Sequence, residues 1–169
     1  LKVDDVSNIV SWALQNKIDL VIVGPELPLT LGLVDALADV GIRAFGPSKK
    51  AAEIEGSKAF AKNLMQKYGI PTAKYAVFTD RESALSFARG MKGPWVVKAD
   101  GLAAGKGVLI CKTIEDTKQA IEEVLTDKSL GDAGKKIVIE EFLEGEELSI
   151  LAFCDGKTAI PMVPAQDHK

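Results

Sequence analysis

The sequence predicts an α/β protein in two parts, a portion of a parallel sheet followed by a small α+β unit. Three observations predict this architecture. Helical and strand patterns alternate over residues 4–48, a linker with glycine and proline follows at Gly69–Thr72, and two strand–helix–strand segments then flank a glycine-rich loop. The chain has 169 residues, 47% of them hydrophobic and 27% charged, which suits one globular domain or two small ones.

In the first part, apolar spacing predicts helices over 4–16 and 29–40 and strands over 19–23 and 43–45. The run Asp19–Val23 (DLVIV) is continuously apolar after its aspartate, which is typical of a parallel strand covered on both faces. Gly24–Pro28 is a predicted turn, and Gly41 is expected to end the second helix. The alternation of helices and strands predicts that the two strands pair in parallel.

The second part continues with helical and strand patterns. We predict helices over 49–55, 58–68, 81–89 and 114–126, and strands over 75–78, 95–99, 108–111 and 136–142. Ser57 is the expected N-cap of the second of these helices. Segments 146–153 and 158–160 are expected to pair as a hairpin across Asp155-Gly156, a common turn pair.

Two loops are candidates for a ligand-binding edge. Ligands of open parallel sheets bind beyond the carboxyl ends of the strands, and here those ends lead into Gly24–Pro28 and Gly46–Ser48. Each loop also fits a simpler interpretation, a tight connection built from glycine and proline. Taken locally, the simpler interpretation is the commoner one.

The segment Pro94–Val108 (PWVVKADGLAAGKGV) carries the strongest signal for a ligand. Strand alternation places Val96 and Lys98 on one face, and a lysine there is costly to bury unless an anion meets it. The glycines that follow allow positive φ and close approach of backbone amides to phosphate oxygens. Because the spacing fits neither a P-loop nor a dinucleotide fingerprint, we predict a glycine-rich flap between two strands. The alternative is an ordinary hairpin with a solvated Lys98.

Lys58 and a group of glutamates are further candidates. Lys58 lies in the first turn of its helix, where the dipole disfavours a cation, and a bound anion would remove that conflict. A solvated lysine is the alternative. Five carboxylates fall within eight positions, at Glu140, Glu141, Glu144, Glu146 and Glu147. They could accept hydrogen bonds from ribose or amine groups, or form a solvated strand end.

Composition argues against several classes of protein. The net charge of −3 and the lack of a basic cluster interleaved with aromatics disfavour a nucleic-acid partner, and no apolar run reaches the length of a membrane span. No signal peptide is recognised, and the chain, which opens at Leu1, is expected to begin inside a longer protein.

Cys111 and Cys154 are expected to be buried, reduced thiols of a cytoplasmic protein, with a disulfide as the alternative.

Several motifs together resemble one family. The segments GPELPL, FGPSKKAAEIEGSKAFAK, GIPTA, VVKADGLAAGKGV, IVIEEFLEGEELS and PAQDHK are similar, in the same order, to the glycinamide ribonucleotide synthetases (phosphoribosylamine–glycine ligases) of purine synthesis, which are members of the ATP-grasp superfamily. The resemblance covers essentially the whole chain. It implies that residues 1–72 end a Rossmann-like pre-ATP-grasp domain, 73–145 form the ATP-grasp lid, and 146–169 begin the large ATP-grasp subdomain.

The resemblance implies roles for particular residues. Lys58 and Lys98 would reach the ATP phosphates, and the flap over them would include Gly101, Gly105, Lys106 and Gly107. The adenine hinge would be Glu140, Glu141, Phe142 and Leu143, with backbone groups of Glu141 and Leu143 reading the base, and Glu147 would bind the ribose. The residues facing the other substrates would be Gly24, Pro25, Glu26, Pro28, Asp167, His168 and Lys169.

The resemblance also implies a reaction on small molecules. ATP would phosphorylate the carboxylate of glycine, and the amine of 5-phosphoribosylamine would attack the acyl phosphate, giving glycinamide ribonucleotide, ADP and phosphate. Mg²⁺ would neutralise the triphosphate. Its ligands are expected beyond Lys169, so this chain is expected to be a central piece of the enzyme and inactive alone. The alternatives are a nucleotide-binding module that has lost catalysis and another ATP-grasp ligase or carboxylase subunit.

Overall fold

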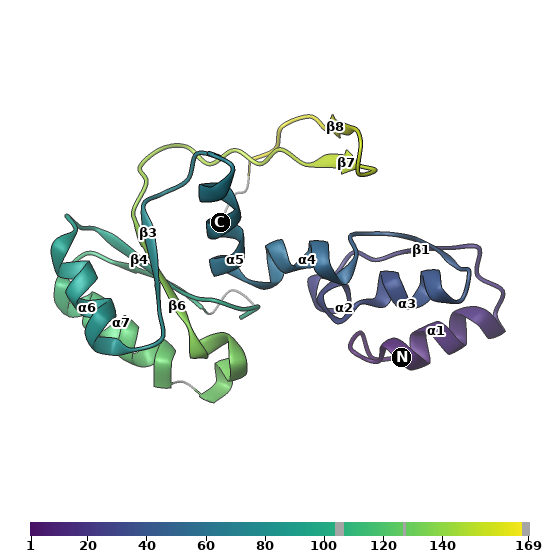
Figure 1. Ribbon diagram of the computed structural model, residues 1–169, viewed down its shortest axis with the longest axis horizontal. Helices are drawn as coiled ribbons and strands as arrows, with labels where there is room; N and C mark the ends of the chain where they lie inside the picture. The colour runs from purple at the N-terminus through teal and green to yellow at the C-terminus, as the bar shows by residue number, and fades with distance from the viewer. Residues whose placement is uncertain (104–106, 127, 167–169) are drawn as a thin grey trace.

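The computed structural model describes residues 1–103, 107–126 and 128–166. The helices are α1 (Val6–Gln15), α2 (Glu26–Leu31), α3 (Leu33–Asp39), α4 (Lys49–Gly56), α5 (Lys58–Lys67), α6 (Arg81–Gly90) and α7 (Ile114–Thr126). The strands are β1 (Leu20–Ile22), β2 (Arg43–Phe45), β3 (Tyr75–Phe78), β4 (Trp95–Ala99), β5 (Val108–Cys111), β6 (Ile137–Glu141), β7 (Ala152–Cys154) and β8 (Ala159–Pro161). A 3₁₀ segment, Lys128–Lys135, precedes β6. Figure 1 shows α4 and α5 lying between an N-terminal group of elements and a second group built around β3–β6.

The N-terminal group contains the predicted parallel pair. Strands β1 and β2 pair in parallel, and their apolar core is shared with α1 and α3. The expectation that Asp19–Val23 is covered on both faces is wrong. Ile22 is 71% exposed and Phe45 45% exposed, because the described helices cover only the opposite face of the two strands.

The predicted helix over 29–40 is two helices, and the turn before it is shorter than expected. Helix α2 begins at Glu26 and includes Pro28, whose missing N–H costs nothing in the first turn of a helix. Gly32 has φ of 91°, a left-handed conformation that ends α2 and starts α3. The break therefore falls at the residue best able to adopt it.

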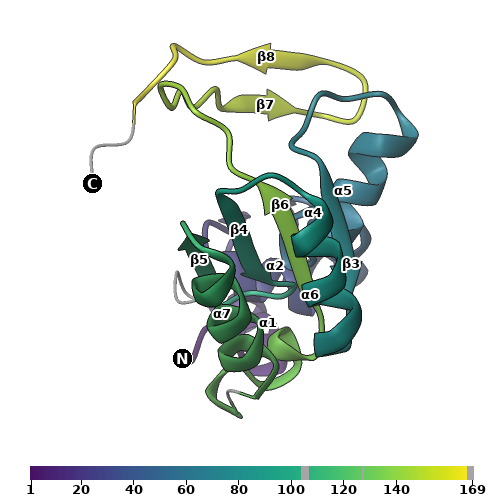
Figure 2. The same cartoon turned by 90° about the vertical axis from the view of Figure 1, so that its left-hand side faces the viewer.

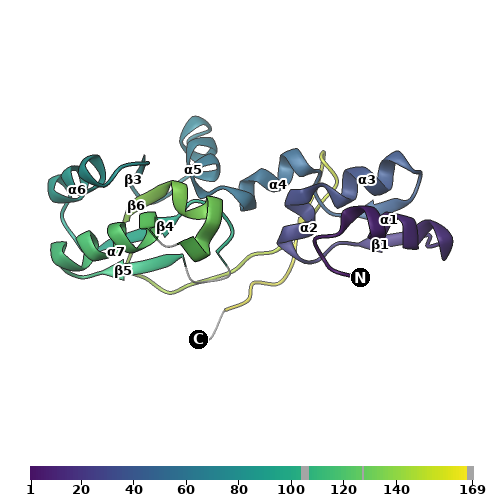
Figure 3. The same ribbon diagram turned by 90° about the horizontal axis from the view of Figure 1, so that it is seen from below.

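Helices α4 and α5 link the two groups, as Figures 1 and 3 show. Both begin at serine caps, as the sequence predicts for the second. The Ser48 hydroxyl accepts a hydrogen bond from the Ala51 N–H at 3.3 Å, and the Ser57 hydroxyl accepts one from the Phe60 N–H at 3.1 Å. After α5, the predicted linker 69–72 contains no regular element.

The second group is the predicted α+β unit. Its sheet has the order β3-β6-β4-β5, every neighbouring pair is antiparallel, and the unit consists of β3-α6-β4 and β5-α7-β6. Helices α6 and α7 cover one face of this sheet (Figure 2).

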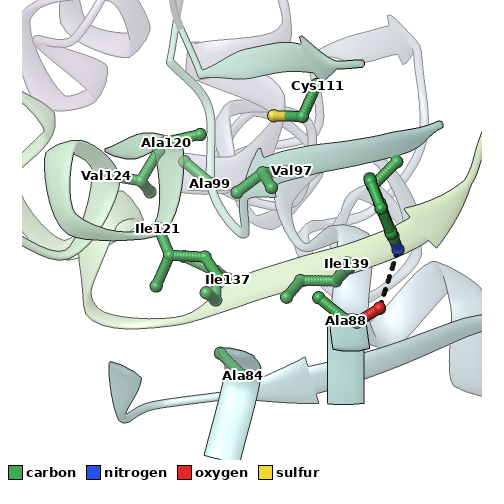
Figure 4. Close-up of a cluster of buried hydrophobic side chains, with 11 residues drawn as sticks. Ala84, Ala88, Val97, Ala99, Cys111, Ala120, Ile121, Val124, Ile137 and Ile139 are labelled. Atoms are coloured by element: carbon green, nitrogen blue, oxygen red, sulfur yellow. Dashed lines mark hydrogen bonds between the residues drawn. The ribbon is translucent and has the colours of Figure 1, made fainter. Parts of the chain in front are cut away.

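The core of this unit lies between the sheet and those two helices (Figure 4). Val97 and Ala99 from β4 and Ile137 and Ile139 from β6 are all fully buried there. The Trp95 indole N–H donates to the Ala88 carbonyl at 3.0 Å, which ties β4 to the end of α6. The predicted alternation along β4 is therefore confirmed on its apolar face.

The final hairpin forms across the predicted turn but is shorter. Cys154 pairs with Ala159, and the Asp155 carboxylate accepts hydrogen bonds from the N–H groups of Lys157 and Thr158. Both cysteines are free thiols, and Cys111 is buried as expected. The expectation that Cys154 is buried is wrong, because β7 and β8 are exposed along their whole length. Within the described residues, no helix is long and apolar enough to cross a membrane.

The position of the core generates a stability prediction. Ile139 is 0% exposed, so Ile139→Ala should lower the free energy of unfolding by about 2–5 kcal/mol through lost burial and a new cavity. Ile110 is 61% exposed on the edge strand β5, so Ile110→Ala should cost less than about 1 kcal/mol. Urea unfolding of the two variants measures both values, and equal losses would contradict this core.

Candidate functional site

A cleft of about 340 Å³ lies between α4, α5 and the sheet face opposite α6 and α7. It is lined by Ile54, Glu55, Lys58, Ala61, Lys62, Met65, Lys98 and Glu140. The structure thus brings together three residues singled out from the sequence, Lys58, Lys98 and Glu140. With three lysines and two glutamates, the cleft lining carries a formal charge of +1. It is therefore a candidate site for an anion.

Glu140 is the buried acid of this cleft. Its neighbour on β6, Ile139, points into the apolar core, so Glu140 points to the opposite face of the sheet. The residue is only 4% exposed. Its Oε2 accepts from the ammonium groups of Lys62 at 2.9 Å and Lys98 at 3.1 Å. Its Oε1 is also buried and has no hydrogen-bond partner in the described part of the chain, so one acceptor remains available.

Lys98 lies on β4 and shares this face with Val96, as strand alternation predicts. Its side chain is 26% exposed, and the anion that meets its ammonium group is the Glu140 carboxylate. The anion that the strand pattern required at Lys98 is therefore supplied by the protein itself. Sequence pattern showed that an anion was needed there, but it did not identify Glu140 on the neighbouring strand.

Sequence reasoning missed Lys62. It lies four residues after Lys58, hence on the same side of α5. Its side chain is 11% exposed, and its ammonium group also donates to the Thr72 hydroxyl at 2.8 Å. The same group lies 5.6 Å from the centroid of the Tyr75 ring. Its i, i+4 spacing from Lys58 was a usable signal in the sequence.

Lys58 occupies the first turn of α5, and its side chain is turned toward the flap. Its ammonium group donates to the Gly101 carbonyl at 3.0 Å, and its backbone N–H donates to the Asp100 carbonyl at 2.9 Å. Burial lowers the pKa of Lys58 below its ordinary value of 10.5, against the opposing attraction of Asp100 and Glu55. Because burial disfavours the charged ammonium of Lys58, an anion that binds beside it would stabilise that charge.

Asp100 resolves the conflict expected at the start of α5. The residue is 8% exposed. Its Oδ1 accepts from the Ala59 N–H at 2.7 Å and from the Ser57 hydroxyl at 2.9 Å. A carboxylate at the helix N-terminus thus provides the negative charge that the sequence argument assigned to a ligand. Sequence reasoning missed Asp100, although it directly follows the strand that carries Lys98.

The described flap glycines do not adopt the positive φ that was expected of them. Neither Gly101 nor Gly107 has a positive φ. A Cβ at Gly101 would lie 2.9 Å from the Ala133 Cβ, and one at Gly107 would lie 2.7 Å from the Ala103 Cβ and 2.9 Å from the Ala99 Cβ. Close packing therefore explains these two glycines. Gly105 and Lys106 lie outside the described residues.

The predicted hinge residues after Glu140 do not line the cleft. The Glu141 N–H donates to the Lys74 carbonyl at 3.0 Å, and its carboxylate accepts from the Lys74 N–H at 2.8 Å. The Phe142 N–H donates to the Pro94 carbonyl at 3.2 Å. Leu143 is 64% exposed and Glu147 is also exposed. The hinge is thus tied to the neighbouring strands at its start and is open beyond Phe142.

Of the residues assigned to the other substrates, the structure describes Gly24, Pro25, Glu26 and Pro28. Gly24, Pro25 and Glu26 are exposed, whereas Pro28 is buried within α2. The second loop, at Gly46-Pro47, lines a separate cavity of about 730 Å³ beside the β7–β8 hairpin. Asp167, His168 and Lys169 lie outside the described residues. Among residues 1–103, 107–126 and 128–166, no group of three or more histidine, cysteine or acidic side chains could hold a metal ion.

The fold and the lysine–glutamate cleft define the class of this protein as ATP-grasp. Residues 56–169 match the model of the phosphoribosylglycinamide synthetase ATP-grasp (A) domain. The fold is similar to a biotin carboxylase–nucleotide complex from Campylobacter jejuni, with a TM-score of 0.81 over 94% of this chain and 36% of that chain, at 19% identity. Since residues 1–55 also match the phosphoribosylglycinamide synthetase N domain, the chain belongs to the phosphoribosylglycinamide synthetase family.

Individual relatives agree with this assignment. The chain is 50% identical over 169 residues to a phosphoribosylamine–glycine ligase of Vibrio vulnificus, and 53% identical over 165 residues to one of Halalkalibacterium halodurans. A crystal structure of phosphoribosylamine–glycine ligase from Thermotoga maritima is similar with a TM-score of 0.65 and 39% identity, over 72% of this chain and 31% of that chain. This chain spans 39% of the length of the two curated relatives.

The contacts of Asp100 generate a second stability prediction. Asp100→Ala leaves the Ala59 N–H and the Ser57 hydroxyl without their buried acceptor, and it should cost about 2–3 kcal/mol of folding free energy. Asp80→Ala is the matched control. It removes an exposed aspartate that caps α6 by accepting from the Ser83 N–H at 2.8 Å, and should cost about 1 kcal/mol. Denaturant unfolding compares them; an Asp100→Ala loss no larger than the control would refute the buried clamp.

Proposed function

We propose that this chain supplies the ATP-binding lid and part of the N-terminal domain of an ATP-dependent phosphoribosylamine–glycine ligase. The observation that carries the proposal is the convergence of Lys58, Lys98 and the buried Glu140 on one cleft. Membership of the phosphoribosylglycinamide synthetase family and the similarity to phosphoribosylamine–glycine ligases support the choice of substrates. In this proposal, 1–72, 73–145 and 146–169 remain the three structural divisions.

The described residues fit a nucleoside triphosphate. Ammonium groups suit phosphate oxygens, and Lys58 and Lys98 both line the cleft. The unpartnered Oε1 of Glu140 is a buried acceptor, which suits the amino group of a base because a buried acceptor without a donor is costly. Mg²⁺ would neutralise the triphosphate when bound, and we place its ligands outside this chain.

The proposed reaction joins glycine to 5-phosphoribosylamine. The γ-phosphoryl group passes to the glycine carboxylate, and the amine then attacks the acyl phosphate with release of phosphate, giving glycinamide ribonucleotide and ADP. The residues of this chain contribute to the first half: Lys58 and Lys98 hold and orient the phosphates, and positive charge at the cleft stabilises the charge that develops during transfer. We further propose a cytoplasmic enzyme acting on small molecules.

The segment between Gly101 and Gly107 completes the proposal as a cover over the phosphates. The described ends of this segment are fixed, since the Gly107 carbonyl accepts from the Ala99 N–H at 2.7 Å and Gly101 accepts from Lys58. A cover anchored at both ends beside Lys58 would exclude water from a labile acyl phosphate. We propose that the other substrates are bound by Gly24–Glu26, Pro28 and Asp167–Lys169.

Lys98 provides the direct test of this function. In a full-length protein that carries this chain, Lys98→Met should weaken ATP binding by about ten- to a hundredfold, because one charge-assisted contact to phosphate is lost. The melting temperature without ATP should change little, since Glu140 keeps its bond to Lys62. The exposed Lys112→Met is the control for loss of one charge. Unchanged ATP affinity with a large fall in melting temperature would make Lys98 structural.

Lys58 generates a proton-linkage prediction. Its pKa is lowered in the free protein by burial, and a phosphate placed beside it would raise that pKa again. ATP binding should therefore take up a proton at pH values between the lowered pKa of the free protein and the raised pKa of the complex, and ATP affinity should fall as pH rises through this window. Calorimetric titrations in two buffers of different ionisation enthalpy measure the uptake. Equal uptake by wild type and Lys58→Met would contradict the assignment.

A further inference from the structure

Two ammonium groups share one carboxylate oxygen in the cleft. Lys62 and Lys98 lie 2.9 Å and 3.1 Å from Oε2 of Glu140, whose side chain is 6% exposed. One cation is enough to neutralise a carboxylate, but a buried carboxylate without any cation is strongly disfavoured. One of the two lysines can therefore leave Glu140 at low cost, provided that the other stays.

The two lysines differ in how firmly they are held. Besides Glu140, Lys62 donates to the Thr72 hydroxyl at 2.8 Å and lies over the Tyr75 ring, and its side chain is 11% exposed. Lys98 is 26% exposed and, among the described residues, donates only to Glu140. Thr72 and Tyr75 thus fix Lys62, whereas Lys98 is free to turn toward the cleft.

We propose that Lys62 is a positioning residue that keeps Glu140 neutralised and in place while Lys98 moves from Glu140 to a phosphate of the bound nucleotide. This inference rests on the proposed function, because it concerns how the same cleft accepts a triphosphate. In this proposal Lys62, although it lines the same cleft, does not contact the nucleotide. It affects nucleotide binding through Glu140 and Lys98.

The proposal predicts a particular pattern of affinity. In Lys62→Met, Lys98 becomes the only cation among the described residues that donates to the buried Glu140 and is held there, so its contact with phosphate is lost. ATP binding should weaken by at least about fivefold. Adenosine has no phosphate for Lys98 to contact, so its affinity should change by less than about twofold. A variant that merely deformed the cleft would weaken both ligands together.

The experiment measures dissociation constants for ATP and adenosine by calorimetry, in the full-length protein that carries this chain. Lys67→Met is the matched control, since Lys67 is exposed in the last turn of the same helix, so its substitution removes an equal charge away from the cleft. Its ATP affinity should stay within about twofold of wild type. Circular dichroism melting confirms that each variant is folded at the titration temperature.

A second background isolates the mechanism. In Glu140→Gln no negative charge remains at position 140, so neither lysine is needed there and Lys98 is already free. Adding Lys62→Met to Glu140→Gln should then change ATP affinity by less than about twofold, against at least about fivefold in wild type, a non-additivity expected only of residues in one charge network.

The outcomes separate this inference from the proposed function. If the wild-type protein does not bind ATP, both fall. If it binds ATP and Lys62→Met leaves ATP affinity unchanged, weakens adenosine equally, or costs as much in the Glu140→Gln background, this inference alone is overturned. Selective loss of ATP affinity that disappears in Glu140→Gln supports it.

Discussion

Two buried carboxylates determine how this molecule is assembled. Asp100 follows β4 and Glu140 lies on β6, and they are 8% and 4% exposed. A buried charge must be compensated, and for both acids part of the compensation comes from α5: the Ala59 N–H donates to the Asp100 carboxylate, and Lys62 donates to Glu140. The helix between the two groups of elements is therefore fixed against the sheet at two points. As a consequence, Lys58 from the helix and Lys98 from the sheet line the same cleft.

The secondary structure could be predicted from the sequence because its signals are local. Strands β2 and β3 have the predicted bounds, and α5 begins at its predicted serine cap. The alternation that placed Lys98 opposite the apolar core also held, since only geometry internal to the strand is involved. Where the prediction failed, tertiary context decided. Asp19–Val23 has the composition of a doubly covered strand, but coverage depends on neighbours that the segment itself does not specify.

The candidate site was predictable only in part, for a similar reason. Local pattern indicated that Lys98 needed an anion, yet its partner is 42 residues away on another strand. Asp100 contacts α5, and Lys62 contacts Glu140 on β6. Neither residue lies in a sequence motif that predicts such a contact. The flap glycines show the same limit. Gly101 and Gly107 are conformationally ordinary, and the requirement for glycine comes from alanine side chains that approach them in the folded state.

The charge pairs of the cleft also constrain what it can bind. In the described structure the Lys58 ammonium donates to a carbonyl and the Lys98 ammonium to a carboxylate. Each of these two ammonium groups therefore already has an acceptor within the protein. A ligand that draws these two lysines toward itself must therefore offer them better acceptors. A neutral ligand offers no charge in exchange for the ion pair between Lys98 and Glu140, whereas a phosphate can offer each lysine a charged oxygen. The contacts that neutralise the charges of the cleft thus favour a polyanion over a neutral ligand of similar shape.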